Sequence, residues 1–155
     1  MKSQFFKGVT YQIFTLFNIF EPNPLIFFLE IRNMKVKIDT KEKMHVISVE
    51  DEKLAANMTE DLRKTLLKFL DEPVKNVVVN FAQVEEMDGE VADILVSLQQ
   101  AFYDAGHSMV FCNFQAPVEK FLDDKELLEL MNFTPTESEA GDIVQMEEIE
   151  RELLL

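Results

Sequence analysis

The densest group of potentially reactive side chains in this sequence is a run of carboxylates near its middle. The run consists of Glu85, Glu86, Asp88, Glu90 and Asp93. Carboxylate oxygens bind hard divalent cations, but such sites need several oxygens converging, often from a defined loop. Because one segment supplies all five acids and no second segment accompanies it, a solvated acidic face is favoured over a metal site. We therefore expect no metal and no cofactor.

The side chains that could act as bases or nucleophiles have no visible partners. His45 alternates with apolar neighbours in a predicted strand, which favours an exposed or edge position, and His107 follows Gly106 in a predicted turn. Cys112 lies in an apolar segment, where a thiol is usually inert. Catalysis needs a convergent base or nucleophile, and the sequence contains no phosphate-loop, dinucleotide-binding, zinc-protease or nucleophile-elbow motif. The sequence therefore predicts a protein that is not an enzyme.

The strands that would hold these residues follow from hydrophobic periodicity. Residues 35–39 alternate with period two and predict a strand. Residues 44–49 predict a second strand, and the short spacing between the two suggests a hairpin. Residues 77–81 and 109–113 are continuous apolar runs, the first rich in valine, which predict central strands buried on both faces. Residues 132–135 are either a short last strand or a loop.

Helical spacing fills the intervals between the strands. A first helix is predicted to begin at Asn57 as its N-cap and to end before Pro73. The clearest helix covers residues 88–102, with Asp88 as its N-cap and Gly106 after its last turn. Its apolar face comprises Val91, Ile94, Leu95, Leu98 and Phe102.

Three more helices are predicted toward the C-terminus. Pro117 suits a first helical turn. Asp123 with Glu126 resembles a capping box that opens a short helix at 127–131. A final helix is expected at 142–155. Its predicted inward face comprises Ile143, Met146, Ile149 and Leu153.

The order of these elements, β-β-α-β-α-β-α and then a further strand or loop and a helix, defines the fold class. Strands that first pair as a hairpin and then alternate with helices favour an α/β domain. We expect a mixed β-sheet with helices packed on it. The sequence has no internal repeat and no long linker that would divide this domain.

Charge is distributed unevenly along the 155 residues. The whole chain carries a formal charge of -14, whereas residues 1–33 carry +1 and residues 34–155 carry -15. A field this negative repels phosphate backbones and anionic lipid surfaces, which argues against binding to nucleic acid or to an anionic membrane surface. A single cysteine cannot form an internal disulfide, so a reduced, cytoplasmic location is expected.

Residues 1–33 form a Phe-rich leader that holds 7 of the 14 phenylalanines. Its longest uncharged run, residues 8–20, is too short and too polar to span a membrane. A mis-assigned start, with Met34 as the natural first residue, is the favoured interpretation. A flexible or peripheral extension and a secretory signal are the alternatives. The domain itself is expected to occupy residues 34–155.

Residues 77–95, VVVNFAQVEEMDGEVADIL, carry a resemblance to a known family. They resemble the STAS domain, named for sulfate transporters and anti-sigma factor antagonists. Its pattern is an apolar strand, a short loop, Asp-Ser-Ser/Thr-Gly and an apolar helix. Residues 109–122 resemble the family's fourth strand and third helix, and residues 137–140 resemble its lead-in to the last helix. The resemblance covers roughly residues 34–150 and implies a STAS-like mixed sheet.

The sequence departs from that family at one position that matters. By the resemblance, Gly89 stands where anti-sigma factor antagonists carry the serine or threonine that a partner kinase phosphorylates. Residues 82–94 contain no hydroxyl side chain. A phosphate at a helix N-terminus meets free N–H groups and adds close to two charges to a docking surface. Without an acceptor this switch cannot operate. Glu90 is at best a partial mimic, and the favoured interpretation is that Asp88 and Glu90 cap the helix.

These observations together predict a non-enzymatic protein-interaction module resembling an anti-sigma factor antagonist. The partner would bind at the N-terminus of the 88–102 helix and at the loops 50–57 and 113–117. The expected contact residues are Asp51, Glu52, Asn57, Asp88, Gly89, Glu90, Asp93 and Gln115. Their acidity predicts a partner protein with a basic surface, such as an anti-sigma factor with a serine-kinase-like fold, and salt-sensitive binding. The alternatives are a STAS scaffold subunit of a sensory or transport-associated complex, and a small-ligand or lipid carrier.

Overall fold

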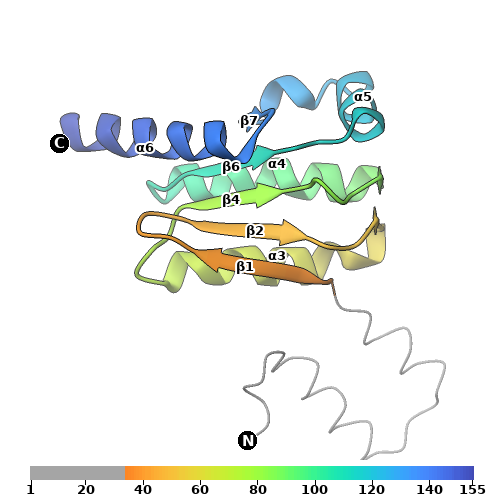
Figure 1. Cartoon of the computed structure of the whole chain (residues 1–155), viewed down its shortest axis with the longest axis horizontal. Helices are drawn as coiled ribbons and strands as arrows, with labels where there is room; N and C mark the ends of the chain where they lie inside the picture. The colour runs from red at the N-terminus through yellow and green to blue at the C-terminus, as the bar shows by residue number, and fades with distance from the viewer. Residues whose placement is uncertain (1–33) are drawn as a thin grey trace, which may run out of the picture. The chain divides into compact units, whose positions relative to one another are not determined.

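The computed structural model describes residues 34–155, so the expectations for the Phe-rich leader at residues 1–33 lie outside the described residues (Figure 1). No helix within residues 34–155 is long and apolar enough to cross a membrane.

A five-stranded mixed sheet forms the centre of the described region (Figure 1). Its spatial order is β1 (Val36–Thr40), β2 (His45–Val49), β4 (Val77–Asn80), β6 (Met109–Cys112) and β7 (Phe133–Thr134). β1 is antiparallel to β2, and every later pair is parallel. The predicted hairpin and central strands are thus confirmed, and residues 133–134 are a strand and not a loop.

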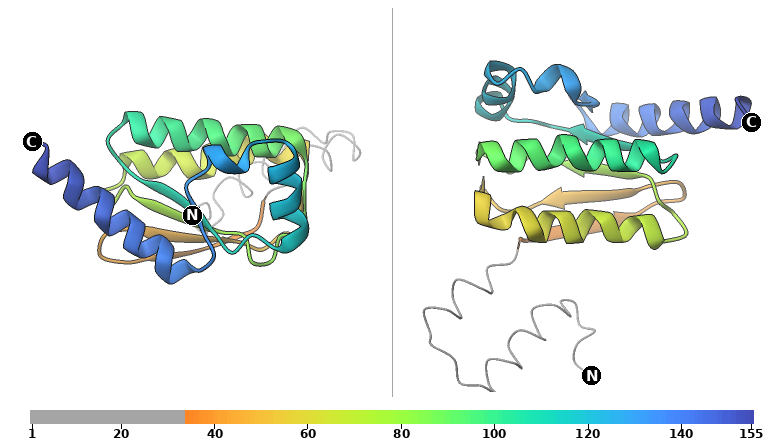
Figure 2. Two further views of the ribbon diagram at one scale, coloured as in Figure 1. Left: turned by 90° about the horizontal axis from the view of Figure 1, so that it is seen from above. Right: turned by 180° about the vertical axis from the view of Figure 1, so that it is seen from behind.

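Helices cover both faces of this sheet (Figure 2). The helices α3 (Thr59–Leu67) and α4 (Gly89–Asp104) lie on one face, and α6 (Glu137–Leu153) crosses the other. The helix α5 (Ala116–Asp124) follows β6. The predicted α/β class, with helices packed on a mixed sheet, is confirmed.

The core lies mainly between the sheet and the α3–α4 layer. Alternate residues of β4 point to opposite faces, as a strand requires. Val77 and Val79 therefore join the large cluster under α3 and α4, whereas Val78 joins a small cluster under α6. All three valines have no exposed surface. Burial on both faces is what the continuous apolar run of β4 predicted.

The helix ends agree with the sequence at one position and differ at another. Gly106, with φ of +80°, ends α4 in a Schellman motif, in which the N–H groups of Gly106 and His107 bond to the carbonyls of Tyr103 and Phe102. Asn57, in contrast, is not an N-cap. It lies inside the 3-10 turn η2 (Ala56–Met58), and no side chain caps α3.

The capping box predicted at Asp123 and Glu126 is also wrong. The helix α5 continues through Asp124, and Glu126 ends it in the left-handed conformation with φ of +58°. The N–H of Leu127 bonds to the carbonyl of Leu122, which closes a second Schellman motif with glutamate in the usual glycine position. Only a single 3-10 turn, η4 (Leu128–Leu130), follows.

The exposed position predicted for His45 is wrong. His45 is 5% exposed, and the centre of its ring lies 4.5 Å from that of Phe69, in the turn η3 (Lys68–Asp71) after α3, with the two rings tilted by 41°. Its Nε2 lies 2.8 Å from the carbonyl oxygen of Val74, and its Nδ1 lies 2.8 Å from Thr40 Oγ1. Because a carbonyl only accepts, Nε2 is the ring donor and Nδ1 accepts the threonine hydroxyl. Period-two alternation could not show that both ring nitrogens would find partners.

The last helix differs most from its prediction. It begins at Glu137, because the Thr136 hydroxyl accepts the N–H of Glu139 and caps it, five residues before the predicted start. Ala140 and Val144 face the sheet. Of the predicted inward residues, Met146, Ile149 and Leu153 are all more than half exposed.

Candidate protein-interaction site

The predicted contact residues come mostly from one edge of the sheet, where the parallel strands β2, β4 and β6 end. The loops after these strands and the first turns of α3, α4 and α5 gather at this edge, at the arrowhead ends in Figure 1. Because parallel strands present all their carboxyl ends on the same side, residues far apart in sequence meet there.

A two-stranded parallel ribbon joins two of these loops. β3 (Lys53–Leu54) pairs with β5 (Glu86–Met87). The carbonyl of Glu52 accepts the N–H groups of Glu85 and Glu86, at 2.7 and 3.1 Å. This ribbon holds the predicted loop 50–57 beside the segment that leads into α4.

Asp88 occupies the N-cap position of α4 but does not cap it with its side chain. Its carboxylate accepts the N–H of Ala56 at 2.8 Å, and its own N–H donates to the carbonyl of Leu54 at 2.9 Å. The expectation that Asp88 caps its own helix is therefore wrong. The carboxylate instead ties the start of α4 to the η2 turn before α3.

Gly89 is the first residue of α4, in an ordinary helical position. A Cβ atom built on Gly89 would lie 3.4 Å from both Cε and Nζ of Lys125, and no other atom outside its own neighbourhood lies within 4 Å. A larger side chain would thus meet only the end of a flexible one. Space does not explain why a glycine stands at this position.

The acidic residues of this edge differ in how they are held. Asp51 is half-buried, and its carboxylate accepts the N–H of Lys35 at 2.7 Å. Glu52, Glu90 and Asp93 are exposed. Within residues 34–155 the side chains of these three accept no hydrogen bond and form no ion pair. These three carboxylates are therefore unpaired within the described residues.

Gln115 and Asn57 complete the predicted set. Gln115 holds the N-cap position of α5, and its Nε2 donates to the carbonyl of Ala82 at 2.7 Å, which fastens the loop after β6 to the loop after β4. Asn57 is exposed on the η2 turn, which contacts α4. The structure brings both residues to the same edge, where Gln115 holds two loops together.

Sequence reasoning missed two basic residues at this edge. Lys53 Nζ lies 3.6 Å from Glu86. Lys125 reaches Gly89, and its Nζ lies 5.6 Å from the centre of the Phe121 ring. Lys125 follows α5 in sequence, 36 positions after Gly89, so only the packing of α5 against β5 brings it there. No local pattern could have indicated this neighbour.

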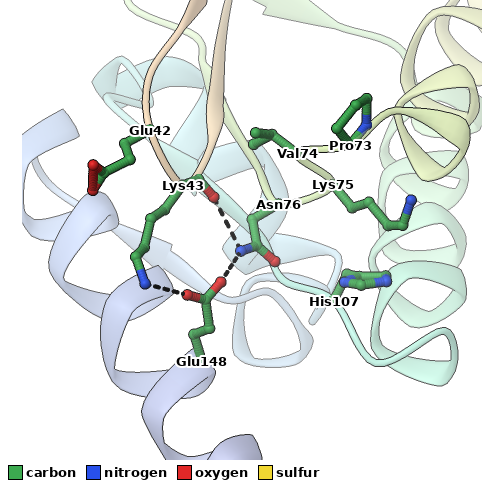
Figure 3. Close-up of a pocket in the computed structure, with 8 residues that line it drawn as sticks. All are labelled: Glu42, Lys43, Pro73, Val74, Lys75, Asn76, His107 and Glu148. Atoms are coloured by element: carbon green, nitrogen blue, oxygen red, sulfur yellow. Dashed lines mark hydrogen bonds and ion pairs between the residues drawn. The ribbon is translucent and has the colours of Figure 1, made fainter.

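A pocket of about 280 Å³ lies at the opposite edge of the sheet (Figure 3). Glu148 lines it, and its carboxylate accepts from Lys43 Nζ at 2.9 Å and from Asn76 Nδ2 at 2.8 Å. The bond from Lys43 lowers the pKa of Glu148. Burial, together with the charges of Arg151 and Lys75, lowers the pKa of His107. The Glu148 carboxylate is thus already paired on two sides and is not a free acid or base in this pocket.

The other groups considered for chemistry are the Cys112 thiol and clusters of metal ligands. Burial raises the pKa of the Cys112 thiol to about 12, so almost no thiolate forms at neutral pH. Residues 34–155 contain no cluster of three or more potential metal ligands.

Similar folds occur among solved structures. An anti-sigma factor antagonist from Mycobacterium paratuberculosis has a TM-score of 0.63 and 12% identity, over 73% of this chain and 95% of that one. The anti-sigma factor antagonist SpoIIAA, in its unphosphorylated form, has a TM-score of 0.58 and 19% identity, over 72% of this chain and 96% of that one. The murine anion transporter Slc26a9 has a TM-score of 0.59 and 15% identity, over 90% of this chain but only 25% of the transporter.

At these identities the structural matches show a shared fold. No curated protein sequence matches the chain significantly. The STAS domain family model matches residues 35–140, a region that contains all five strands of the sheet, the helices α3, α4 and α5, and the first turn of α6. The chain therefore belongs to the STAS domain family.

Proposed function

We propose that this STAS domain is a non-enzymatic interaction module that resembles an anti-sigma factor antagonist. It binds a regulatory protein through the N-terminus of α4 and the adjoining loops. The contact set is the one predicted from the sequence, with Glu52, Glu90 and Asp93 as its free carboxylates and Asp51, Asp88 and Gln115 as residues that hold the loops in place.

The observation that carries this proposal is the construction of the edge itself. Glu90 and Asp93 stand on the first two turns of α4, and Glu52 stands on the ribbon beside them. Exposed carboxylates on a rigid, hydrogen-bonded platform favour a partner with a basic surface and a fast, salt-sensitive association.

Similar structures include SpoIIAA in both a phosphorylated and an unphosphorylated form. By the family resemblance, Gly89 replaces the hydroxyl that would carry such a phosphate. We infer that binding by this chain is not switched at this position. The charge there is fixed by Glu90 and balanced in part by Lys125.

A pull-down from a lysate of the source organism, quantified by mass spectrometry, tests the site. The double variant Glu90→Lys plus Asp93→Lys should lose most of the partner recovered by the wild type. The matched control is Asp71→Lys plus Glu72→Lys, two exposed acids beyond the far end of α3. This control should recover the partner normally. We call the N-terminus of α4 and the adjoining loops 50–57 and 113–117 the α4 edge. Equal recovery by both double variants would rule out the α4 edge as the binding surface.

The second candidate function is a scaffold subunit of a sensory or transport-associated complex. The match to part of the anion transporter Slc26a9 favours it, because there the fold is one portion of a much longer chain. This candidate predicts that several proteins are recovered with the chain in a fixed stoichiometry. If the Glu90→Lys plus Asp93→Lys variant recovered all of them normally, the scaffold function would be supported over the first candidate.

The third candidate is a small-ligand or lipid carrier. Such a carrier needs an apolar cavity, whereas the pocket of Figure 3 is lined largely by charged and polar side chains. Native mass spectrometry that shows a stoichiometric bound small molecule would support this function.

A further inference from the structure

The N-terminal half of α6 packs apolar residues on the sheet, but its C-terminal half turns its apolar side chains toward solvent. Along its C-terminal half, the side that faces the domain is polar. Glu147 accepts from the hydroxyl of Ser108 at 2.6 Å and from Asn132 Nδ2 at 2.9 Å. Arg151 donates to the same hydroxyl at 3.1 Å, and Glu148 bonds to Lys43 and Asn76 (Figure 3). These charged side chains hold the helix to the domain.

The apolar side chains of the same half-helix point away from the domain. Met146, Ile149 and Leu153 are 54%, 53% and 79% exposed. They stand at positions i, i+3 and i+7, which places them along one side of a helix. We call these three residues the outer stripe. A surface helix ordinarily turns such a stripe toward its own core, so the outer stripe of α6 is available to another molecule.

The helix also extends beyond the sheet. In two views its C-terminal turns project past the ends of the strands (Figures 1 and 2). A partner could therefore lie along the stripe without meeting the rest of the domain.

The charges beside the outer stripe indicate the chemistry of its occupant. Asp142, Glu150 and Glu152 are exposed on α6. Its only basic residue, Arg151, bonds back to Ser108. A second copy of this chain would place like carboxylates against one another, and an anionic membrane would be repelled. An apolar stripe bordered by carboxylates complements a helix with an apolar face and lysine or arginine borders.

We propose that the outer stripe of α6 is a second docking surface, which binds a basic amphipathic helix of a partner protein. The surface is distinct from the α4 edge, because it uses different residues on the opposite face of the sheet. The domain thereby has two interaction surfaces and can join two proteins.

A synthetic peptide tests this surface without an identified partner. The probe is a fluorescent peptide of about 18 residues, or five turns, with leucines at i, i+3, i+4 and i+7 and lysines elsewhere. Its binding is measured by anisotropy against the full-length chain. The control peptide has the same composition in an order that does not align the leucines.

The test variant is Met146→Gln, Ile149→Gln and Leu153→Gln together. Its matched control is Ile38→Gln plus Tyr103→Gln, two exposed apolar residues outside α6. None of these changes alters the net charge. We expect the wild type and the control variant to bind the amphipathic peptide at least about tenfold more tightly than the test variant. We also expect them to prefer it to the scrambled peptide. Because the substituted side chains are exposed, all variants should unfold at similar temperatures.

Three results would overturn the proposal. The first is binding by general charge attraction alone. It would appear as equal affinity of the test variant and the wild type for the amphipathic peptide, or as equal affinity of the wild type for the two peptides. The second is a wild-type dimer, seen by sedimentation, that the test variant loses, which would assign the stripe to a second copy. The third is co-sedimentation of the wild type with phosphatidylserine vesicles that the test variant loses, which would assign the stripe to an anionic membrane.

Discussion

Two residues at the start of α4 are central to the proposed function, and neither caps the helix with its side chain. Gly89 leaves the first helical position without a side chain, beside the flexible end of Lys125. Asp88 directs its carboxylate across to the N–H of Ala56. The sequence pattern located both residues correctly on a helix N-terminus. The partner of Asp88 could not be predicted, because it belongs to a turn 32 positions earlier.

The space around Gly89 predicts that an alanine there is tolerated. Gly89→Ala should raise the free energy of unfolding by about 0.5 kcal/mol, because alanine loses less backbone entropy in a helix than glycine does. Gly106→Ala is the contrasting variant and should lower it by about 1 kcal/mol, since φ at Gly106 is +80°. Urea unfolding of both variants measures the difference. A loss of stability in Gly89→Ala would show that the position is sterically closed.

Asp88→Ala should destabilise the fold by about 1–2 kcal/mol, because it leaves the Ala56 N–H without its acceptor. Hydrogen exchange distinguishes this linking role from ordinary capping. The Ala56 amide should exchange faster in the variant, whereas the amides in the first turn of α4 should change little. The matched control, Glu90→Gln, should leave the Ala56 amide unaffected. Acceleration confined to the first turn of α4 would restore the capping interpretation.

At the scale of elements, the sequence predicted strands better than helix faces. Valine-rich runs identify β4 because they pack on both sides of the sheet. The periodicity of α6 is helical, but it does not say which side faces the domain. Apolar packing of Ala140 and Val144 determines which side of the N-terminal part of α6 faces the sheet. Beyond them, bonds to Ser108 and Asn132 determine the orientation. These partners lie 39 and 15 positions away from Glu147 in the sequence, so no α6 pattern could indicate them.

The end of α5 offers a direct stability test. Glu126 adopts the left-handed conformation, which costs a non-glycine residue roughly 1–2 kcal/mol. Glu126→Gly should therefore stabilise the domain by about 0.5–1 kcal/mol, once the greater entropy lost by glycine on folding is subtracted. Thermal unfolding would show a higher midpoint. Glu129→Gly, in the neighbouring 3-10 turn, is the control and should not stabilise the domain.

The loop between α4 and β6 should make the fold sensitive to mild acid. The pKa of His107 lies below its usual 6.5 because of burial and the nearby charges of Arg151 and Lys75. The folded state therefore binds fewer protons than the unfolded state just below pH 6.5. Stability should fall as the pH drops through 6.5 toward the folded pKa, and His107→Gln should flatten this dependence. Urea midpoints at pH 7.5 and 5.5 measure it. An unchanged slope in the variant would assign the effect to other groups.

At the scale of the whole molecule, the uneven charge now has a location. Residues 34–155 carry -15, and parts of that excess stand exposed at the α4 edge and along α6. The sheet separates these two surfaces. Under the proposal that binding is not switched at Gly89, two surfaces that bind different proteins would still allow regulation, because assembly would then depend on which partners are present.

The most direct test of the central claim is hydrogen exchange of the complex with the recovered partner, compared with the free chain. If the partner binds the α4 edge, protection should appear in residues 52–57, 86–93 and 113–117, which the β3–β5 ribbon and the bonds of Asp88 and Gln115 bring together. The β1–β2 turn should exchange at its free rate. Protection confined to that turn and the pocket of Figure 3, with residues 86–93 unchanged, would contradict the account.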